Sequence, residues 1–337
     1  MKPRARLIDV ARDAGVSPAT VSRAVSQPEL LSAQTLARVK ASARKLEYLP
    51  DGAARALASG RAMTIAALVP TLDSAIFARA LQAMQSTLSA AGYQLIVSAH
   101  EYNRLAEGNG IRMLLARGID GLMLVGADRS AEISATLRES NVPVVLTWGA
   151  DGMFPSVGVD NKLAGLLAVR HLVSMGHQRI GMVCGDIAFN DRQRGRLEGV
   201  AAAMTEAGLP FPDWLVSHQA MTVGGGRRGC AALLELKEPP TAVVGGIDLM
   251  AIGCIEEAKS RGLRTPEDLS VIGIDGLEMS AHISPALTTV RVPTTQIGEM
   301  AATILLAEIH KKPIDQQVIL PINLIVRASV ARPNEAS

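Results

Sequence analysis

A glycine-rich stretch in the second half of the chain has residue types that could hold a phosphate group. The six residues GGGRRG, Gly224 to Gly229, fit the pattern G-x-G-x-x-G, and Asp248 follows about 20 residues later. In dinucleotide-binding proteins such glycines let the backbone approach a pyrophosphate, and the acidic residue binds a ribose. The preceding segment, WLVSHQAMTV, is a poor buried strand, although the motif requires a strand there. Nucleotide binding is therefore the alternative interpretation.

A second stretch with a distinctive spacing is DVARDAGVSPATVSRAVS, residues 9–26. Its first part has the apolar spacing of a helix, Gly15 can supply a tight turn, and Ser17 is a good N-cap. Because proline is well tolerated at the first position of a helix, Pro18 is expected to begin a second helix. Two short helices joined by a glycine turn predict a helix-turn-helix, whose second helix enters the major groove of DNA.

The second helix of this motif carries the side chains that would meet DNA. We expect Arg23 to read guanine or hold a phosphate, and Ala19 to contact a thymine methyl group. Val16, Val21 and Val25 are expected to pack inward. An ordinary two-helix corner is the alternative interpretation. The predicted DNA-contacting residues of this region are Ser17, Pro18, Ala19, Thr20, Ser22 and Arg23.

The distribution of charge supports this interpretation. Residues 1–62 contain eleven Lys and Arg but five Asp and Glu, whereas the remainder of the chain contains 23 basic and 27 acidic residues. A basic N-terminal region on a mildly acidic body indicates an anionic polymer as partner.

Composition excludes several other classes of protein. Cys184, Cys230 and Cys254 form no CxxC pair and have no His at metal-ligand spacing, so we expect buried thiols in a reducing cytosol and no metal site. Neither a secretory signal nor an apolar run approaching about 18 residues is found, which predicts a cytoplasmic protein without a membrane partner. Neither G-x-S-x-G, H-E-x-x-H nor a Walker A sequence is present, so we expect no enzyme and no cofactor.

The elements that must position these residues fall into three parts. Residues 1–49 predict a three-helix helix-turn-helix domain, and residues 50–62 a hinge helix and linker. In residues 63–331, apolar strand-like runs alternate with helical stretches, which predicts an α/β body of two doubly wound parallel-sheet lobes. The strand-like runs are TIAALVP, YQLIVSA, GLMLVGA, VPVVLTW, RIGMVCG, TAVVGGID and LSVIGIDG, with VILPINLIVRAS as the last strand. We expect one lobe to span about 63–161 with 291–320 and the other about 162–290 with 321–331, and a ligand to bind between them.

Four segments together carry a family resemblance: LIDVARDAGVSPATVSRAVS, VKASARKLEYLPDGAARALASG, GHQRIGMV and VIGIDG…PALTTVRVP. They resemble the lactose-repressor (LacI/GalR) family of bacterial transcription regulators, from residue 6 to about residue 330. The resemblance implies a helix-turn-helix, a hinge helix and a body like the periplasmic sugar-binding proteins. It also implies homodimers or tetramers on palindromic operator DNA, with an affinity set by a small effector.

The same resemblance assigns roles to residues of the hinge. Leu57 corresponds to the leucine that the family inserts into the minor groove, Ala54 packs one turn earlier, and Arg55 is expected to contact DNA. An apolar wedge of this kind kinks DNA and unstacks a base step at a cost of about a few kcal/mol. Asp51 stands where the family often has Asn.

In the body, the resemblance implies an effector site at the mouth of the cleft. Its residues are Asp73, Ser74, Ile76, Phe77, Trp148, Asp160, Arg196, Asp248 and Asp275. An arginine with acceptor carboxylates fits a sugar or sugar acid. Asp160 or Asp275 could instead cap a helix, and Arg192 or Arg194 could replace Arg196. Because Ile247 and Trp148 stand where the family often has polar residues, we expect a less polar pocket.

The sequence thus predicts a DNA-binding transcriptional regulator, a repressor, that binds a palindromic operator as a homodimer under control of a small molecule. No leucine heptads follow the last strand, which favours a dimer over a coiled-coil tetramer. The alternative is an NAD(P)-responsive regulator, or a Rossmann-type oxidoreductase with a DNA-binding head.

Overall fold

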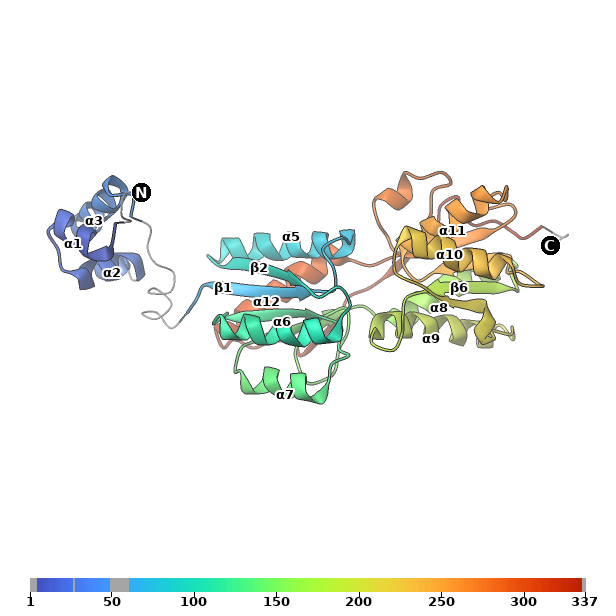
Figure 1. Ribbon diagram of the computed structural model, residues 1–337, viewed down its shortest axis with the longest axis horizontal. Helices are drawn as coiled ribbons and strands as arrows, with labels where there is room; N and C mark the ends of the chain where they lie inside the picture. Colours follow the sequence, from blue (N-terminus) through green and yellow to red (C-terminus); the bar gives the residue numbers. More distant parts are fainter. Residues whose placement is uncertain (1–4, 27, 49–60, 335–337) are drawn as a thin grey trace.

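The structure is a computed structural model that describes residues 5–26, 28–48 and 61–334 (Figure 1). At the N-terminal end it has helices α1 (Leu7–Ala14), α2 (Pro18–Ser26) and α3 (Ala33–Lys45), with a short 3-10 helix at Pro28–Leu30. The hinge residues Ala54, Arg55 and Leu57, and Asp51 beside them, lie outside the described residues.

The boundaries of these three helices follow from their capping residues. Gly15 ends α1 with a left-handed backbone, φ 62°, which glycine adopts without steric cost. Ser17 accepts a hydrogen bond from the Thr20 backbone N–H at 3.1 Å, so Pro18 begins α2 as predicted. Ser32 caps α3 in the same way, through the Thr35 N–H.

The three helices share one small apolar core. Its buried members are Val10, Ala11, Ala14, Val21, Ala24 and Val39. Leu36 and Ala43 of α3, its C-cap residue Leu46, and Val16 pack against this core. Val25 is only half-buried and is not a member of the core.

The remainder of the described chain forms two lobes, each around a six-stranded sheet, as the alternating pattern predicts. The first sheet has the order β11-β5-β4-β3-β1-β2, and all of its pairs are parallel. Its strands are β1 (Thr64–Val69), β2 (Gln94–Ala99), β3 (Gly121–Val125), β4 (Val144–Thr147), β5 (Ser156–Gly158) and β11 (Gln317–Ile319). Its helices are α5 (Ala75–Ala90), α6 (Arg104–Ala116), α7 (Ala131–Glu139) and α12 (Thr294–Ile309).

The second sheet has the order β12-β10-β9-β8-β6-β7 and is parallel except for β12, which runs antiparallel to β10. Its strands are β6 (Ile180–Cys184), β7 (Val216–His218), β8 (Ala242–Gly245), β9 (Ser270–Asp275), β10 (Thr288–Arg291) and β12 (Asn323–Ile325). Its helices are α8 (Asn161–Ser174), α9 (Asp191–Glu206), α10 (Val223–Leu234) and α11 (Asp248–Ser260), with 3-10 turns at Asp213–Leu215 and Met279–Ala281.

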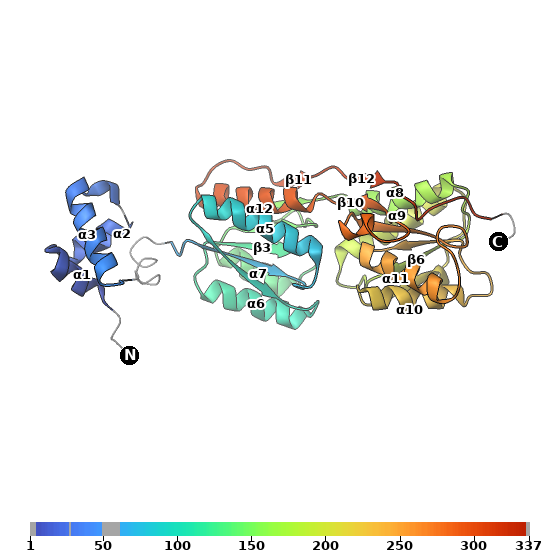
Figure 2. The ribbon, with the colours of Figure 1, turned by 90° about the horizontal axis from the view of Figure 1, so that it is seen from above.

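Helices cover both faces of each sheet, because the strand side chains are apolar on both faces. In β1, Ile65 and Ala67 pack into the core that holds α5 and α12, whereas Ala66 and Leu68 pack into the core under α6 and α7. In the second lobe α8 and α9 form one layer and α10 and α11 the other (Figures 1 and 2). Burial on both faces produces the continuous apolar strands seen in the sequence.

The last predicted strand, VILPINLIVRAS, is wrong as a single element. The structure divides it into β11, which pairs with β5 in the first sheet, and β12, which pairs with β10 in the second. Pro321 lies between the two strands; a proline has no N–H to donate to a sheet, and the chain crosses from lobe to lobe there. Figure 2 shows this segment running along one side of both lobes.

Candidate functional site

Helix α2 presents one face to solvent and buries the other. Ser17, Pro18, Ala19 and Arg23 are exposed, and Thr20 and Ser22 are half-buried. On the opposite side Val21 is 1% exposed and packs into the apolar core shared by α1, α2 and α3. The predicted DNA-contacting residues of α2 are therefore on the accessible side of a helix whose other side is anchored.

The turn before α2 is held by an arginine from α3. Arg38 donates from Nη2 to the Ala14 carbonyl at 2.6 Å and to the Gly15 carbonyl at 3.0 Å. These bonds satisfy carbonyl groups at the C-terminal end of α1, which have no partner within the helix. Arg38 thus stabilises the turn between α1 and α2. Not every arginine of the three-helix domain is therefore available to bind a DNA phosphate.

The body has its main hollow between the two lobes. One cavity, of about 770 Å³, is lined by Thr71, Asp73, Glu101, Tyr102, Asp186, Phe189, Asn190, His218, Gln219, Ala220, Met221 and Thr222. A second cavity of about 900 Å³ adjoins it and shares Thr71, Asp73, Tyr102, Met221 and Thr222. We call the first the inter-lobe cavity and the second the adjoining cavity.

The residues of the inter-lobe cavity come from loops after parallel strands. Thr71 and Asp73 follow β1, Glu101 and Tyr102 follow β2, and residues 186–190 follow β6. Loops at the carboxyl ends of strands are where open parallel sheets bind ligands. The two sheets point these ends toward one another, so the loops of both lobes meet around one space.

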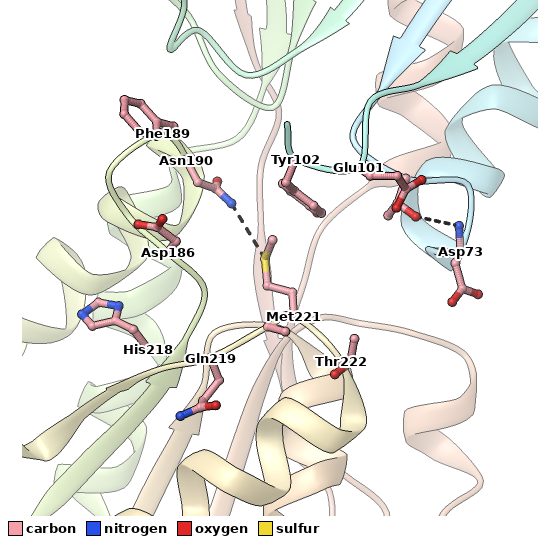
Figure 3. A pocket seen from close by; sticks show the side chains of 12 residues that line it. Asp73, Glu101, Tyr102, Asp186, Phe189, Asn190, His218, Gln219, Met221 and Thr222 are labelled. Atoms are coloured by element: carbon pink, nitrogen blue, oxygen red, sulfur yellow. Dashed lines mark hydrogen bonds between the residues drawn. The ribbon is translucent and has the colours of Figure 1, made fainter. Parts of the chain in front are cut away.

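Figure 3 shows how the two lobes contribute to the walls. Tyr102 enters from the first lobe and Met221 from the second, and their side chains point toward one another. Asn190, 5% exposed, accepts from the Gln193 N–H with Oδ1 and so caps α9. Its Nδ2 lies 3.8 Å from the Met221 sulfur, a weak acceptor.

Behind the cavities lies a buried charged cluster around Arg196. Arg196 is 2% exposed and pairs with Asp275 at 3.2 Å. It also donates to the Gly246 carbonyl at 2.6 Å and to the Asn161 side chain at 3.2 Å. Each end of the guanidinium therefore has a partner within the protein.

Asp248 belongs to the same interior and is fully buried. Its carboxylate accepts from the Leu277 N–H at 2.7 Å, from the Ser280 hydroxyl at 2.7 Å and from the Thr289 hydroxyl at 2.5 Å. These bonds tie α11 to β10 and to the loop after β9. We call Arg196, Asp248 and Asp275 the inner cluster.

The carboxyl groups of the inner cluster hold protons more tightly than exposed carboxyl groups do. Burial raises the pKa of Asp275 to about 7, against the lowering by the Arg196 charge, and the Asp248 charge raises it further. Burial also raises the pKa of Asp248, although its three hydrogen-bond donors oppose the shift. The two acids and one arginine thus form a coupled buried set.

The structure distributes the predicted effector residues over three environments. Asp73, Ser74, Ile76 and Asp275 line the adjoining cavity. Phe77 and Trp148 are buried in the first lobe, with ring centroids 5.2 Å apart and planes at 89°. Asp160 is exposed and caps α8 by accepting from the Leu163 N–H at 2.8 Å, and Arg196 and Asp248 are enclosed in the inner cluster.

Sequence reasoning missed most of the inter-lobe cavity. Glu101, Tyr102, Phe189, Asn190 and Met221 were not among the expected site residues. Their position was a usable signal, because the first four lie in the loops that follow the predicted strands YQLIVSA and RIGMVCG. Glu101 and Tyr102 also have positive φ values, 49° and 56°, which are uncommon outside glycine and often accompany functional loops.

Several contacts join the two lobes beside the cavity. Arg194 of α9 makes two bonds of 2.9 Å to the carboxylate of Asp128 in the first lobe. Asp191 accepts from the Ala127 N–H at 2.9 Å. Arg104 of α6 lies over the Phe189 ring, 4.1 Å from its centroid. A change in the angle between the lobes must break or rearrange these contacts.

The glycine-rich stretch has a structural role that differs from the dinucleotide motif. Gly224, Gly225 and Gly226 lie inside the first turn of α10, which packs against α11. A Cβ on Gly226 would lie 2.2 Å from the Met250 carbonyl oxygen. Only the short edge strand β7 precedes the helix. These glycines let two helices approach closely; because they lie inside α10, they form no glycine loop before the helix that could cradle a pyrophosphate.

Within the described ranges, no group of three or more His, Cys, Asp and Glu side chains is placed to hold a metal ion. The helices there include none that is long and apolar enough to cross a membrane. All three cysteines are buried and free, and burial raises the pKa of Cys184 to about 12, which keeps its thiol protonated.

Comparisons with known proteins agree with both parts of the structure. Residues 6–51 match the bacterial regulatory proteins of the lacI family, and residues 169–330 match the periplasmic binding protein-like domain. The HTH-type transcriptional repressor PurR of Serratia proteamaculans (strain 568) is 35% identical over 332 residues, 97% of each chain. Catabolite control protein A of Priestia megaterium is 32% identical over 326 residues, 96% of this chain and 98% of the relative. The lac repressor dimer bound to operator and the anti-inducer ONPF superimposes with a TM-score of 0.86, at 27% identity over 98% of this chain and 100% of the other.

Proposed function

The chain belongs to the lacI family of bacterial regulatory proteins, and on that premise we propose that it represses transcription by binding a palindromic operator as a homodimer. A small molecule in the inter-lobe cavity controls that binding. The observation that carries the proposal is the combination in one chain of an exposed α2, anchored by its own core, and a cavity lined by both lobes.

DNA recognition rests on α2. Its exposed residues include Arg23, which can reach a guanine or a phosphate, and Ala19, which can meet a thymine methyl group. In a dimer, two such helices enter successive major grooves, and this geometry demands a palindromic site. Leu57, Ala54 and Arg55 of the hinge are proposed to add minor-groove contacts, and Leu57→Ala is expected to weaken specific binding by more than about tenfold.

Control by an effector rests on the inter-lobe cavity. Residues of both lobes line it, so a bound molecule contacts both and favours one angle between them. A ligand shifts such an equilibrium only by its difference in affinity for the two states. The proposed effector residues are those that line the two cavities, including Asp73, Ser74, Ile76 and Asp275. The remaining predicted residues, Phe77, Trp148, Asp160, Arg196 and Asp248, are proposed to support the walls.

The homodimer is proposed to form through the edge of the first lobe. Strand β2 is the edge of its sheet, and Ile96 and Val97 are more than a third exposed on it. On the neighbouring α6, Leu105 is 80% exposed and Met113 is 55% exposed. An unpaired edge with exposed apolar side chains is stabilised when a second copy covers it.

Catalysis is not part of the proposed function. The relatives named above are transcriptional regulators, and the chain is proposed to act on DNA in the cytoplasm without a cofactor. The buried thiols and the internal hydrogen bonds of Arg196 and Asp248 support this assignment.

A selection of bound DNA tests the proposed function. The purified full chain is incubated with random double-stranded fragments, and bound fragments are recovered and sequenced over several rounds. We expect a palindromic consensus. The same selection with Arg23→Ala is expected to lose that consensus, whereas Arg138→Ala, an exposed arginine on α7 of the first lobe, is expected to keep it. Recovery of no consensus by the unmodified chain would contradict the proposal.

A further inference from the structure

Acidic side chains predominate among the charged residues that line the inter-lobe cavity. Asp73, Glu101 and Asp186 line it, and its lining contains neither lysine nor arginine. Figure 3 shows Asp73 and Glu101 on the same side, where the first lobe faces the cavity. Within the described part of the chain, nothing hydrogen-bonds to or pairs with the carboxylates of Asp73 and Glu101. The site therefore offers a ligand two unneutralised negative charges.

The arginines near the cavity are already engaged. Arg79 pairs with Glu278 across the cleft, Arg194 with Asp128, and Arg196 with Asp275. Arg104 lies over the Phe189 ring, and Arg192 pairs with Asp191. An anionic ligand would find no lysine or arginine on the wall of the inter-lobe cavity, and it would lie close to the free carboxylates. Like charges in a cleft repel one another.

The remaining walls fit a ring that carries hydroxyl groups. Tyr102 and Met221 face one another from the two lobes and can cover an apolar ring face. Asn190 is a buried amide whose orientation is set by its cap on α9. Its Nδ2 has only the Met221 sulfur at 3.8 Å as acceptor, so a ligand oxygen would be a much better one.

We propose that the effector is a hydroxylated ring compound carrying a protonated amine, with the amine at Asp73 and Glu101 and a ring oxygen or hydroxyl accepting from Asn190. The inference rests on the proposed function, because it assumes that the effector binds in the inter-lobe cavity. It narrows the class expected from the sequence by excluding sugar acids and phosphorylated sugars. The phenol ring of Tyr102 adds a face that attracts a cation.

Calorimetric titration with three matched pyranoses tests this proposal. D-glucosamine, D-glucose and D-glucuronate share a ring and differ in charge. With the full chain we expect glucosamine to bind at millimolar concentration or below, glucose to bind more weakly and glucuronate to bind least. Tighter binding of glucuronate than of glucosamine, or no binding of glucosamine, would overturn the proposal.

Substitutions at Asp73 and Glu101 test whether these carboxylates bind the amine. The double variant Asp73→Asn with Glu101→Gln is expected to weaken glucosamine binding by about tenfold or more and to leave glucose binding within about twofold. Asp213→Asn, an exposed acid of the second lobe outside both cavities, is the matched control and is expected to change neither. An unchanged glucosamine affinity in the double variant would overturn the assignment of the amine.

The DNA selection described above separates two kinds of failure. If the chain selects a palindrome and glucosamine does not bind, the ligand class is wrong and the proposed function stands. If the chain selects no DNA sequence, the proposed function itself fails, whatever the three sugars do.

Discussion

Two polar regions of the body lie close together and differ in how their charges are satisfied. In the inner cluster, Arg196, Asp248 and Asp275 are buried, and each has partners within the protein. In the inter-lobe cavity, Asp73 and Glu101 face open space without such partners. A buried charge without a partner is costly, so buried groups are paired internally. The unpaired groups of the cavity are those that a ligand can meet.

The largest expected effect comes from removing a carboxylate of the inner cluster. Asp248→Ala leaves three buried donors, at Leu277, Ser280 and Thr289, without an acceptor. Each unsatisfied donor costs about 1–3 kcal/mol, so we expect the free energy of unfolding to fall by at least about 3 kcal/mol. Urea denaturation at a fixed protein concentration measures the change.

The matched control is a carboxylate of the cavity. Asp73→Ala removes an exposed side chain without a partner, and we expect a change within about 0.5 kcal/mol. If the two variants lost equal stability, the contrast between inner cluster and cavity would be wrong.

A pH dependence of stability sharpens the same contrast. The pKa of Asp275 is about 7 in the folded chain, above the ordinary 3.8, so the folded state holds a proton that the unfolded state has released. The contribution of Asp275 to the free energy of unfolding is fully present below about pH 4, the pKa of this group in the unfolded chain. It is lost as the pH rises to about 7, the pKa of the group in the folded chain. Between pH 5 and pH 8 the loss from this group is about 2–3 kcal/mol.

Asp275→Asn removes the titrating group, so the variant is expected to lose less stability than the unmodified chain between those two pH values. Paired urea denaturations at pH 5 and pH 8 measure the difference. A variant with the same or a steeper loss than the unmodified chain would mean that Asp275 is ionised throughout this range.

The smallest expected effect comes from the partly exposed pair that joins the lobes. Arg194→Ala breaks the bonds to Asp128, and since both side chains are more than a quarter exposed, we expect a loss of about 0.5–1 kcal/mol. Arg170→Ala breaks a comparable exposed pair with Glu206 inside the second lobe and is the control. Amide hydrogen exchange at residues 126–129 is expected to rise in the first variant only, because of these two pairs only Arg194 with Asp128 joins the two lobes.

Much of the fold could be predicted because it depends on local patterns. The continuous apolar runs became β1 to β4, β6, β8 and β9, and Pro18 begins α2 as its capping residue indicates. The strands β5, β7 and β10 were not predicted, because runs of three or four residues with polar members do not differ from loops in sequence. The split of the last strand depends on pairing with two different sheets, which is not a local property.

The candidate site was harder to predict for a related reason. Residues carried over from a family indicate positions but not which side chains become enclosed. Arg196 has a partner at each end, and Trp148 is 1% exposed, so neither lines the cavity. Tyr102 and Met221 come from different lobes, and only the folded chain brings them together.

The central claim is that the chain recognises DNA through the exposed face of α2. Fluorescence anisotropy with the selected palindromic fragment measures it directly, for the unmodified chain, Arg23→Ala and Arg138→Ala at one salt concentration. We predict that Arg23→Ala lowers the affinity by about tenfold or more, as expected for losing a base or phosphate contact, and that Arg138→Ala stays within about twofold. Equal affinities of all three proteins would contradict the account.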